Sequence, residues 1–147
     1  MAIDDPTIHA SAVLIGLKAA LIRGPSGAGK SKLAWQLLHS ALPLTRLVGD
    51  DRVYVEAQAG RLLIRPAENL AGLIEMHGLG IRRVPYEPLA VAGLIVDLAA
   101  ADAERLPAEQ ARQTAISGVT LPRLAVAAGA DALQIILACL GTAANAY

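Results

Sequence analysis

The sequence predicts an α/β fold with a mixed central sheet, and three observations lead to this prediction. An apolar run at 19–22 is typical of a buried strand, a glycine-rich segment follows it, and apolar residues then recur at helical spacing over 33–41. Two further apolar stretches, 53–57 and 61–65, flank an Ala-Gly pair, which predicts a β-hairpin. Because a hairpin pairs antiparallel strands, the sheet is expected to be mixed rather than purely parallel.

The remaining elements follow from the same patterns. The expected strands are 8–17, 19–23, 46–49, 53–57, 61–65 and 91–98. A helix is expected from about Ser31 to Ala41, and it stops before Pro43 because proline cannot continue a helix. Residues 68–76 predict a weaker helix, and the Ala-rich segment 100–113 is consistent with a helix or a loop.

A terminal helix is predicted after Asp131. Asp131 and Gln134 fit a pattern that caps a helix N-terminus, and Gly141 is a suitable stop. This helix is apolar on almost every side, so we expect it to be buried or used in assembly.

The composition predicts one globular domain over residues 1–147. Hydrophobic residues make up 54% of the chain and Phe is absent, so Leu, Ile, Val and Ala must fill the core. The formal net charge of zero argues against a nucleic-acid partner, because such domains usually carry a basic surface. The single cysteine, Cys139, cannot form an internal disulfide and is expected to be a small buried residue.

No part of the sequence predicts secretion or membrane insertion. Residues 1–6 are acidic and lack a signal-peptide pattern. The longest apolar stretch, 124–140, is interrupted by Asp131 and Gln134 and is too short for a membrane span. The protein is therefore expected to be soluble and cytoplasmic, without a membrane partner.

The glycine-rich segment, loop 24–31, is the most informative part of the chain. It fits the phosphate-binding pattern G-x-x-x-x-G-K-[ST] at every fixed position. Glycines let backbone N–H groups surround phosphate oxygens, and the helix N-terminus adds partial positive charge. Lys30 is expected to reach the outer phosphates, and Ser31 is expected to offer a hydroxyl to Mg²⁺. The predicted nucleotide-binding residues are Gly24, Pro25, Ser26, Gly27, Ala28, Gly29, Lys30 and Ser31.

Phosphoryl transfer also needs a carboxylate at the end of a neighbouring strand, and two candidates are open. Asp97 ends the apolar run 94–96, which is the usual pattern. The pair Asp50-Asp51 follows the run 47–49, and one carboxylate of the pair can hold Mg²⁺ while the other accepts a proton. Adjacent residues of a regular strand point to opposite faces, so the pair can share a site only if the strand ends before it. A polar turn before the hairpin is the alternative interpretation.

Other polar residues are weaker candidates on pattern alone. A lone histidine on an apolar strand, such as His9, is more often a core residue than a catalyst. Glu75 and His77 border a glycine-rich segment, which indicates either a ligand site or a turn. The pair Arg82-Arg83 is best explained as solvated, although a contact with a phosphate or an acidic partner is also open.

Several segments, taken in order, resemble the catalytic domain of HPr kinase/phosphorylase. Val48-Gly49-Asp50-Asp51 resembles the family's Val-Ala-Asp-Asp, and residues 73–81 resemble its signature Leu-x-Glu-Ile-Arg-Gly-Leu-Gly-Ile. The other matching segments are Ile8-His9, the loop Gly-x-Ser-Gly-x-Gly-Lys-Ser and Thr120-Leu121-Pro122. The resemblance covers nearly the whole chain, and the Glu-x-x-Gly-Leu-Gly signature together with the Asp-Asp pair makes it specific.

The resemblance implies a P-loop kinase domain whose mixed sheet is similar to the nucleotide domain of phosphoenolpyruvate carboxykinase. It implies an enzyme that uses ATP and Mg²⁺ to phosphorylate a serine of HPr, or of an HPr-like phosphocarrier, in the bacterial phosphotransferase system. The family can also run phosphorolysis of phosphoserine at the same site.

The resemblance also implies roles for individual residues. Asp50 is the acid/base on the serine hydroxyl, Lys30 neutralises phosphate charge, and His9 helps to poise the site. The implied Mg²⁺ ligands are Ser31, Asp51 and Glu75. These roles move the preferred acid from Asp97 to the Asp50-Asp51 pair and leave Asp97 as strand-end structure.

The chain departs from the family pattern at three places. Lys32 stands where the family usually has an acidic residue, and His77 replaces the signature arginine. Residues 127–131, Ala-Ala-Gly-Ala-Asp, contain no arginine where the family has Arg-Pro-Gly-Arg-Asn. Because that arginine is associated with the phosphorylase direction, phosphorolysis and pyrophosphate use stay open, as does assembly into a homo-oligomer.

Two alternatives to the kinase acting on HPr stay open. One is a small P-loop kinase with a metabolite acceptor, in which Asp97 serves the metal. The other is a non-catalytic nucleotide-sensing module whose affinity for a signalling partner depends on the bound nucleotide.

Overall fold

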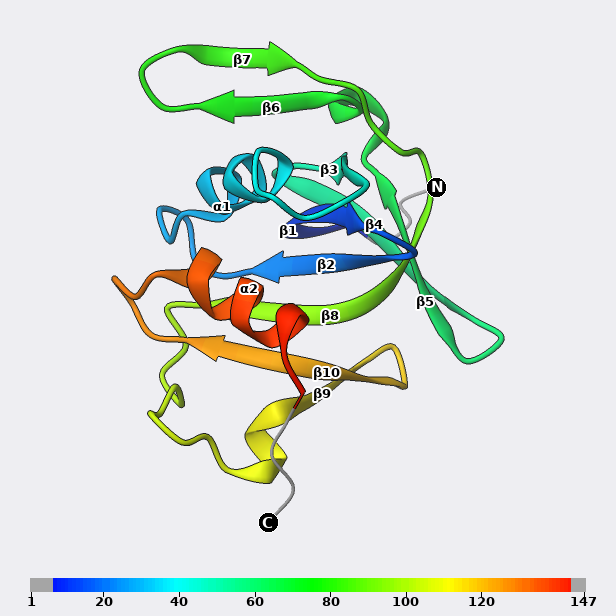
Figure 1. The fold of residues 1–147 in the computed structure, drawn as a ribbon. Helices are drawn as coiled ribbons and strands as arrows, with labels where there is room; N and C mark the ends of the chain where they lie inside the picture. The colour runs from blue at the N-terminus through cyan, green and yellow to red at the C-terminus, as the bar shows by residue number, and fades with distance from the viewer. Residues whose placement is uncertain (1–6, 144–147) are drawn as a thin grey trace.

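A mixed sheet forms the centre of the computed structural model, which describes residues 7–143 (Figure 1). The segment 1–6, whose acidic composition was noted above, lies outside the described residues. The strands of this sheet pair in the order β3-β1-β2-β8-β10-β9, and β2–β8 and β8–β10 are its parallel pairs. Their bounds are β1 (Thr7–Ile15), β2 (Lys18–Arg23), β3 (Thr45–Gly49), β8 (Ala90–Leu98), β9 (Gln113–Ile116) and β10 (Val119–Val126).

A hairpin covers one face of the central sheet. It consists of β4 (Arg52–Gln58) and β5 (Arg61–Pro66), as the sequence predicts. β4 pairs with the start of β1, and β5 pairs with the start of β8, so β1 and β8 each belong to two sheets. The core between these layers is built from small and branched residues that include Ala12, Ala19, Leu21, Val53, Leu62, Ile64 and Ile95.

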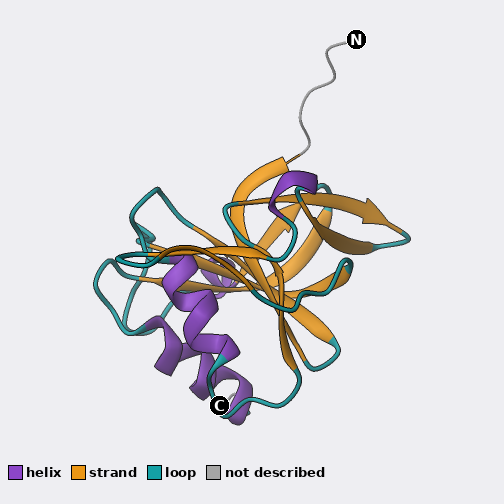
Figure 2. Cartoon of the chain, turned by 90° about the horizontal axis from the view of Figure 1, so that it is seen from above, coloured by secondary structure: helices purple, strands orange, loops and turns teal. Residues whose placement is uncertain are grey.

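Two helices cover the opposite face of the central sheet. α1 (Lys30–Leu38) and α2 (Ala132–Gly141) lie together on one side of the strands (Figure 2). They bury a second core whose members include Val13, Ile22, Leu33, Leu37, Val96, Val126 and Ile136. α2 begins where expected, because the Asp131 side chain accepts a hydrogen bond from the Gln134 backbone N–H at 3.2 Å.

α1 ends at Leu38, before the expected Ala41. The Ser40 hydroxyl donates a hydrogen bond to the Leu37 carbonyl oxygen at 2.7 Å and accepts one from the Leu42 N–H at 3.3 Å. Such local bonds compete with the helical pattern and favour a turn.

The helix predicted at 68–76 is wrong. Only a short 3₁₀ turn, Glu68–Leu70, forms there, and β6 (Leu73–Met76) then pairs with β7 (Gly80–Arg83) in a hairpin beyond α1 (Figure 1). Gly72, inside the expected helix, has a φ of 74°, which a regular helix excludes and glycine accepts. Ile74 is buried against the α1 side of the core, so tertiary packing outweighs local helix propensity.

Two further segments differ from expectation or add to it. Cys139 is exposed rather than buried, because α2 is an outer layer that turns only one side toward the sheet. Ile135 and Leu140 on the same helix are exposed too, so burial explains only part of its apolar composition.

The segment 100–113 is a loop with a short 3₁₀ turn, Glu109–Arg112, and the β9–β10 hairpin that follows was not predicted.

α2 has ten residues, and no helix within residues 7–143 is long and apolar enough to cross a bilayer.

The end of β3 passes very close to the β4–β5 layer. A Cβ atom on Gly49 would lie 2.6 Å from Val53 Cγ1 and 3.3 Å from Pro66 Cα. Glycine at this position therefore lets β3 reach the acidic pair while β4 starts directly behind it.

Leu37→Ala is expected to lower the free energy of unfolding by about 2–5 kcal/mol, because Leu37 is fully buried between α1 and the sheet. Leu17→Ala is the matched control. Leu17 is 94% exposed in the β1–β2 turn, so its truncation should change stability by less than about 0.5 kcal/mol. Urea unfolding measures both. Equal effects of the two substitutions would contradict the packing of α1 described here.

Candidate active site

Loop 24–31 leaves β2 at the edge where the parallel strands end. A Cβ atom on Gly24 would lie 3.1 Å from both Cβ and the carbonyl oxygen of Leu98, so the loop starts in contact with the end of β8. Gly27 and Gly29 have φ values of 83° and 99°, in the left-handed region that glycine accepts without strain. These glycines turn the backbone back toward α1, whose first N–H groups lack helical partners.

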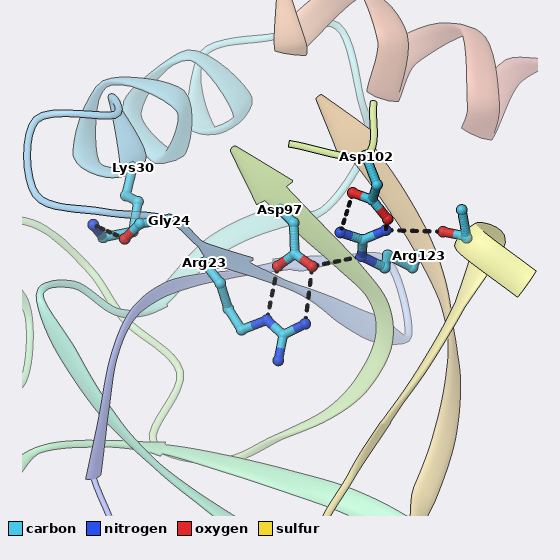
Figure 3. A network of polar contacts seen from close by, with 7 residues as sticks. Arg23, Gly24, Lys30, Asp97, Asp102 and Arg123 are labelled. Atoms are coloured by element: carbon cyan, nitrogen blue, oxygen red, sulfur yellow. Dashed lines mark hydrogen bonds and ion pairs between the residues drawn. The ribbon is translucent and has the colours of Figure 1, made fainter. Parts of the chain in front are cut away.

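Lys30 folds back over the loop that precedes it. Its Nζ donates a hydrogen bond to the Gly24 carbonyl oxygen at 2.7 Å (Figure 3). It donates another to the Pro25 carbonyl oxygen at 3.1 Å. Burial lowers the pKa of Lys30, and the negative charges of Asp51 and Asp50 offset part of this effect. The ammonium group thus lies inside the curve of the loop, where an anion would meet it.

Asp50 is the centre of a buried polar cluster. It is 3% exposed, and both of its carboxylate oxygens accept from the Ser31 hydroxyl, at 2.8 and 2.9 Å. The Ser11 hydroxyl of β1 also donates to Asp50, and the Glu75 backbone N–H lies 3.4 Å from Asp50 Oδ2. One carboxylate therefore links the end of β3 to α1, β1 and β6.

Asp51 faces solvent, although it follows Asp50 directly. β3 ends at Gly49, and Asp51 has a φ of 69°, so the alternation of a regular strand no longer applies. Its Oδ1 lies 3.3 Å from Nε2 of His9, and the two side chains are 63% and 41% exposed. The strand therefore ends before the acidic pair, which is the condition under which Asp50 and Asp51 can share one site. His9 is partly exposed, so it is not the core residue that a lone histidine on an apolar strand is expected to be.

A cavity of about 600 Å³, the acidic cavity, brings these groups together. Its lining includes His9, Ser26, Lys30, Asp51, Glu75 and His77. Asp50 lies behind this lining and reaches the cavity through Ser31, which also lines it. The structure thus gathers the loop, the acidic pair and Glu75 at one place.

Asp97 belongs to a different cluster, on the face of the sheet opposite the helices. It accepts two hydrogen bonds from Arg23, at 2.8 and 2.9 Å, and one from Arg123 Nε at 2.6 Å (Figure 3). Arg123 also pairs with Asp102 at 2.8 Å. Burial raises the pKa of Asp97, but the hydrogen bonds and charges of both arginines outweigh burial and hold this pKa below its ordinary value. Asp97 therefore ties the ends of β2, β8 and β10 together.

Ser11 is a site residue that the sequence reasoning missed. It is fully buried and bonds directly to Asp50. It lies two positions after His9 on an otherwise apolar strand, so both side chains share one face of β1. A hydroxyl in that position is the signal that points to a polar partner across the sheet.

A glycine-rich loop after a parallel strand, with a lysine, a serine and adjacent carboxylates beside it, is an arrangement typical of phosphotransferases. The family model described as "HPr Serine kinase C-terminal domain" matches residues 4–87, more than half of the chain. The chain therefore belongs to this family.

Curated relatives match about half of the chain. The HPr kinase/phosphorylase of Streptococcus thermophilus is 43% identical over 79 residues, which cover 53% of this chain and 25% of the relative. That of Mycoplasma mycoides subsp. mycoides is 35% identical over 80 residues, covering 52% and 24%. The chain thus spans about a quarter of the length of the curated relatives that it matches.

A solved structure extends the likeness over most of the chain. The HPr(Ser) kinase/phosphatase from Coxiella burnetii superposes with a TM-score of 0.73 at 23% sequence identity. The match covers 90% of this chain and 91% of that chain, so it supports the fold.

Acid is expected to weaken the fold through Asp97. The pKa of Asp97 in the folded chain lies below its ordinary value of 3.8, so the unfolded chain binds the proton more readily. The stability that Asp97 contributes is therefore complete above about pH 5 and is lost as the pH falls through 3.8 to the folded pKa. Asp97→Asn should cost about 2 kcal/mol at pH 7 and should flatten the acid side of the stability curve.

Urea unfolding of both proteins between pH 7 and pH 3 measures this effect. Asp102→Asn is the control, because Asp102 meets the same arginine at the surface, and its effect should be smaller. Parallel curves for the wild-type and Asp97→Asn proteins would contradict the role of the Arg23–Asp97–Arg123 cluster.

Proposed function

We propose that the chain is an ATP-dependent protein-serine kinase that acts on HPr or an HPr-like phosphocarrier of the bacterial phosphotransferase system. Family membership supports the kinase class, and relatives named HPr kinase/phosphorylase support this acceptor. The observation that carries the proposal is the contact of Ser31 with Asp50, because it joins loop 24–31 to the acidic pair. The proposal treats residues 1–147 as one P-loop catalytic domain, similar to the nucleotide domain of phosphoenolpyruvate carboxykinase, that works in the cytoplasm.

In the proposed reaction, the acceptor serine oxygen forms a bond to the γ-phosphorus of ATP. The bond from this phosphorus to the β–γ bridging oxygen breaks, ADP leaves, and the hydroxyl proton passes to a carboxylate of the site. The backbone N–H groups of loop 24–31 and the start of α1 hold the phosphates. Lys30, which is already inside the loop, exchanges its carbonyl partners for phosphate oxygens.

The residues present fit a magnesium ion. Mg²⁺ prefers oxygen ligands and is usually held by one or two carboxylates together with substrate phosphates. Ser31 Oγ lies 2.8–2.9 Å from the Asp50 oxygens, and Glu75 lines the same cavity. Within residues 7–143, no three His, Cys, Asp or Glu side chains form a metal cluster, so phosphate oxygens would have to supply further ligands to the ion. When bound, Mg²⁺ neutralises charge on the transferred phosphoryl group.

The distances favour a division of roles between the two aspartates that is the reverse of the one implied by the family resemblance. Asp50 is buried and bonds to the Ser31 hydroxyl, which lines the acidic cavity, so an ion held at Ser31 would also meet the Asp50 carboxylate. Asp51 lines the cavity, is exposed and faces His9, so an acceptor hydroxyl can reach it. We therefore infer that Asp51 accepts the serine proton with His9 as its partner, and that Asp50, Ser31 and Glu75 serve the metal.

Two matched substitutions test the function and the roles together. Asp51→Asn should reduce transfer from γ-labelled ATP to HPr by at least about 100-fold, because the proton acceptor is lost, while Mg-ATP still binds. Asp50→Asn should also stop transfer, and it should abolish the difference between ATP affinity with Mg²⁺ and with a chelator. Mass spectrometry locates the phosphoserine, and calorimetry measures ATP binding.

The control is Asp102→Asn, an identical change outside the acidic cavity, which should transfer phosphate normally. If Asp50→Asn keeps magnesium-dependent binding and Asp51→Asn loses it, the roles return to those that the resemblance implies. Full transfer by both variants would overturn the kinase proposal.

Asp97→Asn separates the proposal from its rivals. Asp97 is already bonded to Arg23 and Arg123, so it is not available to a metal ion. This variant should therefore retain phosphate transfer to HPr under conditions where it is still folded. Inactivity of Asp97→Asn, with both acidic-pair variants active, would favour a kinase with a metabolite acceptor. ATP binding without any phosphate transfer by the wild-type protein would favour the nucleotide-sensing module.

A further inference from the structure

A second cavity, of about 580 Å³, lies on the other side of loop 24–31. Its lining comes from the loop, from the first turns of α1 at 32–36, from Leu98 and Ala99 at the end of β8, and from 126–132, where the chain passes from β10 to α2. We call it the alanine cavity after Ala99, Ala127, Ala128, Ala130 and Ala132 in its lining. Its volume falls in the range of about 300–1,000 Å³ that is typical of small-molecule sites.

The loop is a shared wall of the two cavities. Gly27, Gly29 and Lys32 line both the acidic cavity and the alanine cavity. Asp51, Glu75 and His9 belong only to the acidic side, and the segment 126–132, which includes Asp131, belongs only to the other side. A molecule held by its phosphates on the loop therefore has one end among the catalytic side chains and its other end at the alanine cavity.

The topology explains why this second cavity exists. β2, β8 and β10 are parallel, so the loop, Ala99 and the segment 127–131 all follow strands that end at the same edge. Ligands of open α/β sheets bind in the crevice beyond these carboxyl ends. α2 then starts at Asp131 and closes the far side of the crevice against α1.

The chemistry of the lining suits a flat group with polar edges. The four residues of the turn 127–130 are exposed, and their small side chains leave its backbone open to a ligand, apart from the Ala130 N–H and the Ala127 carbonyl, which bond to each other at 3.1 Å. Gln36 adds an amide that can both donate and accept. Lys32 is the cation of the lining, and Asp131 is its carboxylate, which is already bonded to the Gln134 N–H.

We propose that the alanine cavity binds the nucleoside part of the nucleotide, with the base between Ala99 and the turn 127–130. This inference rests on the proposed function, because it assumes that loop 24–31 holds the phosphates. It assigns the C-terminal third of the chain, beyond the part that matches the family, a direct role in binding ATP. The terminal phosphate then faces Asp51 and Glu75 across the loop.

The test compares ATP with inorganic tripolyphosphate, which offers the phosphates without a nucleoside. Calorimetry with Mg²⁺ should show that the wild-type protein binds ATP at least about tenfold more tightly than tripolyphosphate. Ala128→Trp fills the cavity and should remove this preference by weakening ATP binding at least about tenfold, with tripolyphosphate affinity unchanged. Ala130→Trp is a second filling variant in case the first fails to fold, as judged by thermal unfolding.

The matched control is Ala57→Trp, an exposed alanine on β4 outside both cavities, which should bind both compounds like the wild-type protein. Equal affinity of the wild-type protein for ATP and tripolyphosphate, or an equal loss of both in the filling variants, would overturn the nucleoside assignment and leave the proposed function intact. If the wild-type protein binds neither compound, the proposed function fails as well.

Discussion

The parallel pairing of β2 with β8 is the constraint on which the rest of the structure depends. Residues 19–22 of β2 are at most 2% exposed, because the β4–β5 hairpin and the helices cover the two faces of the sheet. β8 and β10 run in the same direction, so the chain leaves all three strands at one edge. The loop after β2 and the turns after β8 and β10 are therefore neighbours regardless of their own sequences.

Two carboxylates at this edge, the buried Asp50 and the partly buried Asp97, have different electrostatic surroundings. Asp97 contacts two arginines, so its charge is neutralised where it stands and it serves to hold strands together. The hydrogen-bond donors of Asp50 are hydroxyl and amide groups, which stabilise a carboxylate without cancelling its charge, and the nearby Lys30 ammonium donates to backbone carbonyls instead. Because its hydrogen-bond partners are neutral, Asp50 can attract a further cation, and this difference separates the structural aspartate from the one suited to a metal.

Local pattern in the sequence was enough to predict β1 to β5 and β8, the β4–β5 hairpin, loop 24–31 and the Asp131 cap, because each of these depends on residues close together in the chain. It failed where distant packing decides the outcome. Residues 73–76 form a strand rather than a helix, because Ile74 is buried in the core beside α1. Cys139 is exposed because α2 forms an outer layer. The acidic pair was recognised as a pair, but the burial of Asp50 and the exposure of Asp51 depend on Ser11, Ser31 and a backbone turn that spacing alone does not reveal.

Gly49 connects the acidic pair to the layer behind it. The family motif has alanine at this place, yet here a methyl group would overlap the Val53 side chain. Residues 49 and 53 are thus expected to vary together among relatives, with alanine at the first accompanied by a smaller side chain or a displaced strand at the second. A relative's motif cannot be grafted onto this chain one residue at a time, because the strand that supports the motif must be exchanged with it.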